Sequence, residues 1–339
     1  MLLFLIFPTV TLALFGPQDS VYNETEAKLL LNLSAAAYST DPTPCIQRTF
    51  PSNENTQVAT SFSVKCDFVG NPCAGYVTVS TVLQQITVVF RGTKTNSQLI
   101  LEGWATTQPS SDFYGLGLVN RYFKTGHDKT WDYVQGVLNN TQYANYDVYV
   151  TGHSLGGALA ALAAPRIVSS GLRQRNQVKV TTFGEPRVGN LVFSKNYDQL
   201  LPYSFRVVHS TDIVPHLPGC VKDLSYVPPE GSDGSMPCDP VSTNGGYHHA
   251  LEIWYPMNMT TGSPYNVCTG SPHDEDFTCS DAAKVYFNDT TLAIWNHRNY
   301  FAVEVPDFGK GGCNPTMTFE GPPTTQGIKG LVSSLFGRK

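Results

Sequence analysis

The sequence is poor in charge and has no long apolar run. Only 14% of its 339 residues are charged, with 22 Lys and Arg against 27 Asp and Glu. The basic residues form no cluster, which argues against a nucleic-acid surface. No stretch reaches the ~20 apolar residues that a transmembrane span needs. Hydrophobic residues nevertheless make up 41% of the chain, which excludes a disordered protein.

Motifs for metals and phosphate-containing cofactors are also missing. There is no HExxH or zinc-ribbon spacing, no P-loop and no phosphate-cradling G-x-G-x-x-G. The acidic run at 273–276 could bind a cation such as calcium, but such runs are usually solvated loops. We therefore predict no metal and no cofactor.

Several features predict export. Residues 1–15 are nearly all apolar, a run too short to span a bilayer but typical of a signal peptide, which we place at 1–16. Cysteines are even in number, at eight, as in disulfide-bonded extracellular proteins. We therefore expect a secreted, extracellular glycoprotein. Its five glycosylation sequons are at Asn23, Asn32, Asn139, Asn258 and Asn288.

Apolar, β-branched runs alternate with helical patterns along the chain. This alternation predicts an α/β fold with a largely parallel sheet. We expect one domain over 17–314 and a flexible C-terminal tail over 315–339. The polar stretch 40–73 is expected to form loops. Strands are predicted at 76–82, 86–90, 146–150, 178–183 and 205–209, and helices at 24–38, 129–138 and 155–167.

A candidate nucleophile lies between one predicted strand and one predicted helix. The sequence Gly152-His153-Ser154-Leu155-Gly156 fits G-x-S-x-G and joins the strand 146–150 to a helix of small residues. This strand–turn–helix context is typical of a nucleophile elbow, in which a tight turn presents the serine hydroxyl above the sheet. A glycine-rich turn with an uninvolved serine is the alternative.

A serine nucleophile needs a base and an orienting acid. In hydrolases with this elbow they follow in the order Asp, then His. Asp212 comes just after the strand 205–209, although it could merely begin the turn before Pro215. Chain order and context leave three histidines as the base, and we favour His297. His153 is expected to point away from Ser154. The remaining two candidates are His248 and His249.

Five strings in order make the chain similar to a known family, from about residue 27 to 313. It resembles the class 3 lipases, the filamentous-fungal type of triacylglycerol lipase, which have the α/β-hydrolase fold. The resemblance implies Ser154 as nucleophile, Asp212 as acid and His297 as general base. It also implies an oxyanion hole made by Leu155 and Thr93. The strings are VVFRGT (88–93), VTGHSLGGALAALAA (150–164), FGEPRVGN (183–190), DIVPHLP (212–218) and HRNYF (297–301).

The resemblance further implies disulfides and a lid. A helical lid over about 94–109 would cover the site in water and open on lipid. Its apolar residues would be Leu99, Ile100, Leu101 and Trp104, although the sequence of this stretch departs from the family pattern. The implied disulfides are Cys45 with Cys313, Cys66 with Cys73 and Cys268 with Cys279, which leaves Cys220 and Cys238 to pair.

The expected activity is hydrolysis of glycerolipid carboxylic esters at a lipid–water interface, by a triacylglycerol lipase-like serine esterase. A phospholipase A1 or a feruloyl-type esterase on the same scaffold is an alternative, and the apolar lid residues argue against the latter. A catalytically inactive lipid-binding protein is a further alternative. It is disfavoured because Ser154, Asp212 and His297 are all retained.

Overall fold

The computed structural model describes residues 21–66, 72–93, 107–282 and 290–323. Several predictions fall outside the described residues. They concern the signal peptide at 1–16, the lid residues Leu99, Ile100, Leu101 and Trp104, and the sequon at Asn288. Within the described part of the chain, no helix is long and apolar enough to cross a membrane.

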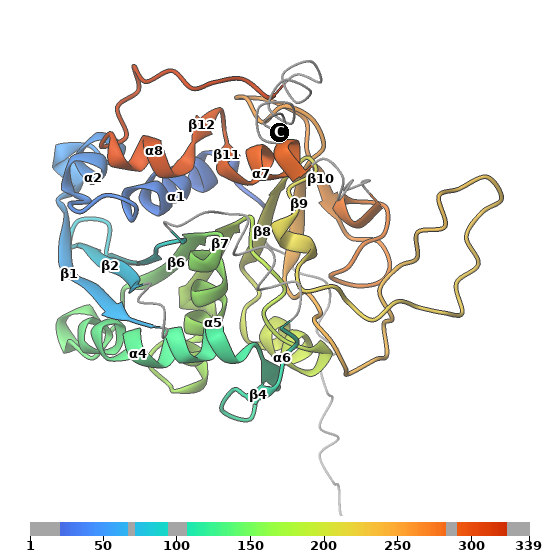
Figure 1. The fold of residues 1–339 in the computed structure, drawn as a ribbon. Coiled ribbons are helices and arrows are strands. Elements are labelled where there is room, and N and C mark those ends of the chain that lie inside the picture. Colours follow the sequence, from blue (N-terminus) through green and yellow to red (C-terminus); the bar gives the residue numbers. More distant parts are fainter. Residues whose placement is uncertain (1–20, 67–71, 94–106, 283–289, 324–339) are drawn as a thin grey trace, which may run out of the picture.

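One eight-stranded sheet forms the centre of the molecule (Figure 1). The five strands β3, β6, β7, β8 and β9 in its middle pair in parallel, whereas the pairs β1–β2, β2–β3 and β9–β10 toward the edges are antiparallel. The predicted α/β fold with a largely parallel sheet is therefore confirmed. In spatial order the strands are β1 (Thr56–Lys65), β2 (Pro72–Ser80), β3 (Gln85–Phe90), β6 (Asp147–His153), β7 (Val178–Phe183), β8 (Ser204–His209), β9 (Leu251–Tyr255) and β10 (Asn266–Cys268).

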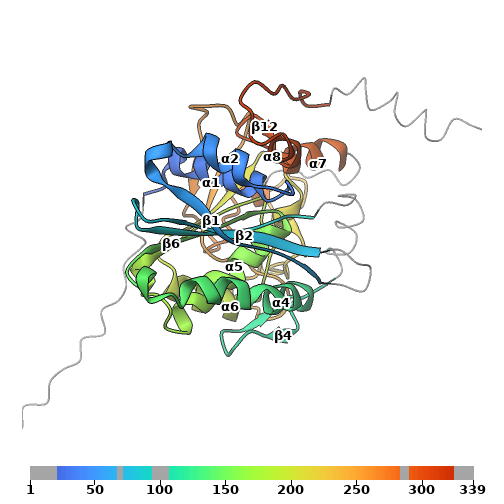
Figure 2. The ribbon, with the colours of Figure 1, turned by 90° about the vertical axis from the view of Figure 1, so that its left-hand side faces the viewer.

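Helices cover both faces of this sheet, giving three layers (Figure 2). On one side lie α4 (Arg121–Leu138), α5 (Leu155–Ser169) and α6 (Leu191–Leu200). On the other lie α1 (Glu24–Ala36), α2 (Thr43–Thr49), α7 (Thr290–Arg298) and α8 (Val305–Lys310). Short pieces complete the fold: strands β4 (Ser111–Asp112), β5 (Leu118–Val119), β11 (Asn299–Tyr300) and β12 (Val303–Glu304), and 3-10 helices η1 (Ser52–Glu54), η2 (Thr141–Tyr143), η3 (Arg175–Gln177), η4 (Val214–His216) and η5 (Ser280–Ala282).

The central strands are apolar because both of their faces are buried. Val148 and Val150 of β6 belong to the core under α4 and α5. Val89 of β3 and Val207 of β8 face the core under α1 and α8. Each of the two helix layers therefore packs on one face of the sheet and buries a separate hydrophobic cluster there.

Two predicted stretches differ from the structure. Residues 40–73, expected to be loops, contain α2 and β1. Most side chains of β1 are exposed or half-buried, as on a sheet edge, so its sequence lacks the apolar run of a central strand. The expected flexible tail begins too early at 315: Met317 and Phe319 pack on the core, and the Trp295 indole N–H donates to the Glu320 carbonyl.

Four disulfides join the eight cysteines, all of which lie in the described part of the chain. They pair Cys45 with Cys313, Cys66 with Cys73, Cys220 with Cys238 and Cys268 with Cys279. These are the pairs that the resemblance implies, together with the pair left over. The first spans 268 residues of sequence and fastens α2 to the segment after α8.

A buried histidine in α4 predicts how stability depends on pH. His127 stacks on Trp131 at 5.2 Å between ring centroids, and burial lowers its pKa to about 4. The unfolded histidine titrates near ~6.5, so acid favours unfolding between these values. Neutral His127 makes its full contribution to the free energy of unfolding above about pH 6.5. Between about pH 6.5 and 4, this contribution falls by about 1.4 kcal/mol for each pH unit.

We therefore expect the free energy of unfolding of His127→Phe to fall less steeply with acidification than that of the unmodified protein. The two slopes should differ by the amount that corresponds to about one proton taken up on unfolding. Urea unfolding at pH 7, 6, 5 and 4.5 measures both slopes. Identical slopes would show that His127 is not held neutral.

Candidate active site

Ser154 occupies a strained turn between β6 and α5. Its φ is 62° and its ψ is −129°, a left-handed conformation that costs of order 1–3 kcal/mol for a non-glycine residue. The turn fits only because its neighbours are glycines. A Cβ on Gly156 would lie 2.2 Å from the Phe90 carbonyl oxygen, and one on Gly152 would lie 2.2 Å from the Gly156 carbonyl carbon. The geometry is that of a nucleophile elbow.

Asp212 and His297 form a buried pair. Asp212 follows β8, His297 lies in the last turn of α7, and the His297 Nδ1 is 3.0 Å from both carboxylate oxygens. Burial alone would raise the pKa of Asp212. The charge and hydrogen bond of His297, with bonds from the Tyr300 hydroxyl and the Val214 N–H, lower it below its ordinary value. An ionised Asp212 fixes the proton on Nδ1 and leaves the His297 Nε2 free as a base.

The serine and this histidine line one pocket. Thr93, predicted for the oxyanion hole, lines it as well. Leu155 is the first residue of α5, so its N–H has no partner within the helix. The structure thus brings together Ser154, His297 and Thr93, with Asp212 behind His297. The other lining residues are Tyr38, His153, Ile213, Val214, Ile294, Arg298 and Pro306.

The rival histidines hold the fold together elsewhere. His248 is buried and its Nε2 donates to the Pro215 carbonyl at 2.7 Å, while His249 lies against Glu185 with neither exposed. Neither lines the pocket. The geometry therefore favours His297 as the base.

His153, which the sequence predicts to point away from Ser154, lines the pocket and lies against His297. Its ring stacks on His297 at 4.7 Å. Its Nε2 lies 2.7 Å from the His297 carbonyl oxygen and its Nδ1 lies 2.8 Å from the Tyr38 hydroxyl. Because a carbonyl only accepts, Nε2 carries the proton and Tyr38 donates to Nδ1. Burial, with the nearby His297, lowers the pKa of His153 to about 3, so a neutral ring supports His297.

Sequence reasoning also missed Tyr300. Its buried hydroxyl donates to the Asp212 Oδ2 at 2.6 Å. The only signal was its place in the string HRNYF, three residues after His297. The contact of Tyr300 with Asp212 joins residues 88 positions apart, and that of His153 with His297 depends on the orientation of a ring. Both therefore become visible only in the tertiary structure.

A buried charge cluster anchors the loop that carries Asp212. The Arg187 guanidinium contacts Glu275 at 2.7 Å and Asp281 at 3.0 Å. It also donates to the Pro218 carbonyl at 3.2 Å, and Asp281 lies 2.9 Å from the His216 Nδ1. The C-terminal end of the segment 212–218 is therefore tied to the protein interior.

The acidic run 273–276 is mostly occupied by protein partners. Glu275 pairs with Arg187, and Asp276 accepts the Gly270 and Thr278 N–H groups. Asp274 contacts the Ser194 hydroxyl and the His273 ring. These carboxylates therefore hold the loop in place.

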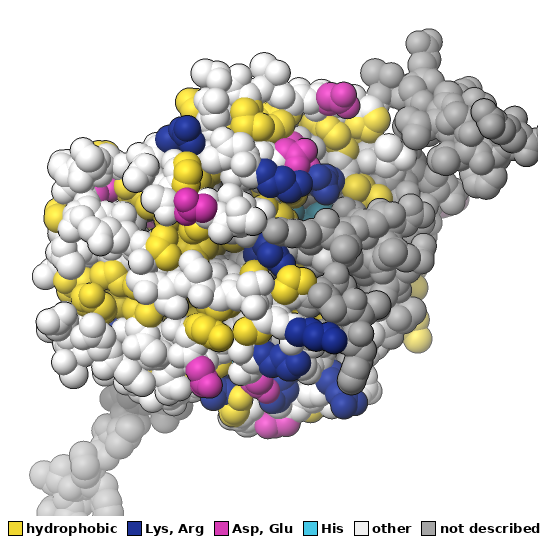
Figure 3. Space-filling view, turned by 60° about the vertical axis from the view of Figure 1, so that its left-hand side comes forward, with side chains coloured by type: hydrophobic (Ala, Val, Ile, Leu, Met, Phe, Trp, Pro, Cys, Tyr) yellow, Lys and Arg dark blue, Asp and Glu magenta, His cyan; other side chains and the backbone are white. Residues whose placement is uncertain are grey.

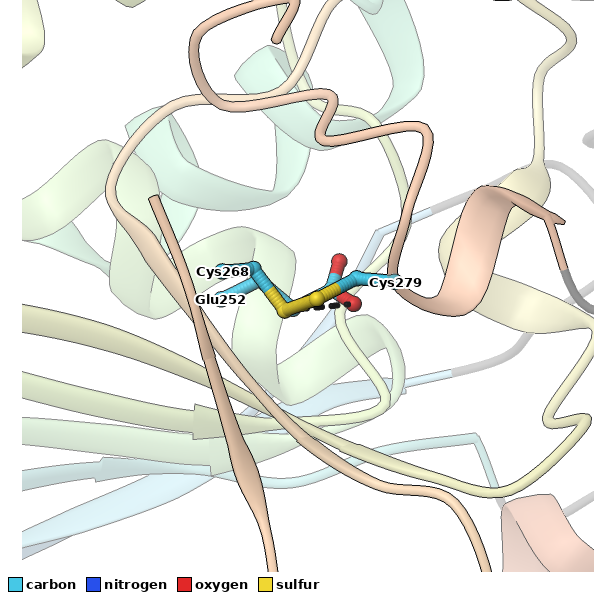
Figure 4. Close-up of side chains that lie close together, drawn as sticks. All are labelled: Glu252, Cys268 and Cys279. Carbon is cyan, nitrogen blue, oxygen red and sulfur yellow. Dashed lines mark hydrogen bonds between the residues drawn. A yellow bond between two sulfur atoms is a disulfide. The ribbon is translucent and has the colours of Figure 1, made fainter. Parts of the chain in front are cut away.

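Another carboxylate lies beside two cysteines (Figure 4). Glu252 is buried, and its Oε1 lies 3.7 Å from the Cys268 sulfur and accepts the Ser280 N–H. Cys268 and Cys279 are joined in a disulfide, so they present no thiolate to a metal. This group stabilises the β9–β10 region.

The elbow, the parallel sheet and the Asp–His pair define an α/β-hydrolase. The family model described as Lipase (class 3) matches residues 87–222. A Caenorhabditis elegans protein named Lipase ZK262.3 is 72% identical over 338 residues, covering 100% of this chain and 96% of that protein. The chain therefore belongs to the class 3 lipase family, and it is a carboxylic ester hydrolase.

More distant proteins agree. The secreted mono- and diacylglycerol lipase 1 of Fusarium solani is 31% identical over 166 residues, covering 46% of each chain. The crystal structure of a lipase from Rhizopus microsporus var. chinensis matches with a TM-score of 0.65 at 24% identity, covering 87% of this chain and 91% of that one. At that identity the structural match supports the fold alone.

The hydrogen bond from Tyr300 to Asp212 can be tested by mutation. We expect Tyr300→Phe to lower kcat about tenfold on a soluble ester, because a hydrogen bond to a charged group contributes about 1.5–3 kcal/mol. KM should change little. Tyr197→Phe is the matched control, since its buried hydroxyl bonds Ser204 instead. Equal kcat values for the two variants would contradict a role for Tyr300 in holding Asp212.

Proposed function

We propose that the chain is a secreted serine esterase that hydrolyses carboxylic ester bonds of glycerolipids through an acyl-enzyme on Ser154. One observation carries this proposal. Ser154 stands on a strained elbow in the same pocket as His297, whose Nδ1 is held by the buried Asp212. The proposal assigns this catalytic domain to residues 17–314.

Acylation begins when the His297 Nε2 removes the proton from Ser154. The serine oxygen attacks the ester carbonyl, and the carbonyl oxygen becomes negatively charged. The N–H of Leu155 and the N–H and hydroxyl of Thr93 would stabilise this oxyanion. Losing one such donor typically slows the reaction ~10²–10³-fold.

The intermediate then collapses, and protonated His297 donates its proton to the leaving alcohol oxygen. Water enters, and its oxygen attacks the acyl-enzyme carbonyl as His297 removes one of its protons. The new intermediate collapses, the bond between the acyl group and Ser154 Oγ breaks, and His297 returns the proton to Ser154 as the fatty acid is released. Asp212 keeps the imidazole in one tautomer and stabilises its charged form. The protein groups supply every proton transfer in this sequence.

The choice of glycerolipid as substrate rests on the pocket and on the relatives. The walls of the pocket include the apolar side chains of Ile213, Val214, Ile294 and Pro306, and such a surface suits the acyl chain of a lipid. The Fusarium relative is named for mono- and diacylglycerols. The proposal includes a lid at about 94–109.

Export is supported by several features. The described residues contain four disulfides and no free cysteine, as in proteins of oxidising compartments. The Fusarium relative is named as secreted. Three predicted glycosylation sites, Asn23, Asn139 and Asn258, are exposed, whereas Asn32 is half-buried in α1.

Substitution of the nucleophile tests the mechanism. Ser154→Ala should lower kcat on emulsified triacylglycerol and on a soluble short-chain ester by at least ~10³-fold, because the remaining groups cannot form the acyl-enzyme. Ser169→Ala, at the exposed far end of the same helix, is the control. Full activity in Ser154→Ala would refute the serine mechanism.

The same assay tests the substrate class. Triacylglycerol is varied across its solubility limit, and a sharp rise in rate as the emulsion forms is expected if the apolar lid opens on lipid. Activity confined to the soluble ester would contradict the assignment to glycerolipids.

A further inference from the structure

One wall of the catalytic pocket carries a permanent charge. Arg298 directly follows His297, lines the pocket, and has 36% of its side chain exposed. It is the only Lys, Arg, Asp or Glu among the described residues that line this pocket. An acyl chain gains nothing from a guanidinium, which remains charged at any physiological pH.

Within the described part of the chain, the ion pair of Arg298 engages one of its two terminal nitrogens. Glu304 pairs with the Nη2 of Arg298, whereas a guanidinium has five N–H donors. Burial raises the pKa of Glu304, and Arg298 opposes that rise. One partly buried carboxylate therefore does not saturate the hydrogen-bonding capacity of Arg298.

A second guanidinium, that of Arg91, adds positive charge around Tyr38, although Arg91 does not itself line the pocket. Burial raises the pKa of the Tyr38 hydroxyl, and the charges of Arg298 and Arg91 both oppose that rise. Tyr38 itself lines the pocket. Near the centre of the face seen in Figure 3, Lys and Arg side chains lie beside a histidine, and Asp and Glu side chains are interspersed among the basic residues of this face.

The chemistry of the ester decides which part of the substrate meets Arg298. His297 must protonate the leaving alcohol oxygen, so the alcohol part of the substrate lies on the His297 side of the pocket. Arg298 follows His297 in α7 and lines the same pocket, so its guanidinium is available to that part of the substrate. In a glycerolipid the leaving alcohol is the glycerol, and it carries the headgroup.

We propose that Arg298 binds the phosphate of a glycerophospholipid headgroup, so that the enzyme cleaves a carboxylic ester of phosphate-bearing glycerolipids. The inference rests on the proposed serine esterase function. The planar fork of a guanidinium matches two phosphate oxygens, a geometry that an ammonium group cannot reproduce. Arg298 is thus a specificity residue placed one position from the general base.

Mixed micelles provide the test. Unmodified protein, Arg298→Gln, Arg298→Lys and Glu304→Gln are assayed on phosphatidylcholine and on diacylglycerol with the same acyl chains. Hydrolysis of p-nitrophenyl butyrate, which has no headgroup, normalises for any effect on His297. Lys310→Gln is the control, because Lys310 is an exposed lysine of α8 paired with Asp307.

The ratio of kcat/KM for phospholipid over diacylglycerol should fall about tenfold or more in Arg298→Gln, the range of a charge-assisted hydrogen bond. The ratio for Arg298→Lys should lie between those of the unmodified protein and Arg298→Gln, because lysine keeps the positive charge but cannot contact two phosphate oxygens as the planar guanidinium does. Glu304→Gln should raise the ratio, because it removes the competing carboxylate. Lys310→Gln should leave the ratio unchanged.

Four results would overturn the proposal. The ratio could be unchanged in Arg298→Gln, or all substrates could lose activity equally, as for a purely structural residue. Alternatively, Arg298→Gln could relieve inhibition by added oleate at a constant ratio, which would assign the guanidinium to the released fatty acid. Unmodified protein that cleaves the butyrate ester and diacylglycerol but not phosphatidylcholine would refute only the phosphate site. Protein inactive on every ester would refute the serine esterase function itself.

Discussion

The close approach of β6 to α5 is the constraint on which the rest of the site depends. Ser154 has a positive φ, and neighbouring backbone atoms fill the space that a Cβ at position 152 or 156 would need, so both residues are glycine. The turn therefore cannot relax, and its serine is held at the end of the central sheet. The parallel strands on either side then bring Asp212 and the pocket wall to the same edge.

Buried charge is the second organising principle. Asp212 is fully buried, and it stays ionised because His297, Tyr300 and the Val214 N–H all donate to it. The same requirement explains the Arg187 cluster, which would otherwise place an unpaired guanidinium in the core. Through Pro218 and His216 that cluster fixes the loop that begins at Asp212. Stability and catalytic geometry therefore share one network of hydrogen bonds.

Much of this arrangement was predictable because its signals are local. The buried strands read as short β-branched runs, and the elbow reads as a glycine-bounded serine between a strand and a helix. The base was harder: chain order left His248 and His249 as rivals to His297, and the resemblance to a family favoured His297. The support given by His153 and Tyr300 could not be predicted, since it depends on side-chain orientation in the folded protein. The edge strand β1 was missed because its exposed face removes the apolar run that marks a central strand.

The disulfide between Cys45 and Cys313 turns most of the described chain into a covalent ring. Ser154, Asp212 and His297 all lie inside it. A protease that cuts one peptide bond anywhere in the ring opens it but releases no fragment, and the three residues stay on one molecule. The bridge from Cys220 to Cys238 forms a smaller ring across the long loop that projects beside the sheet in Figure 1. A cut between Cys220 and Cys238 leaves even the larger ring closed, because the chain stays connected through this second bridge.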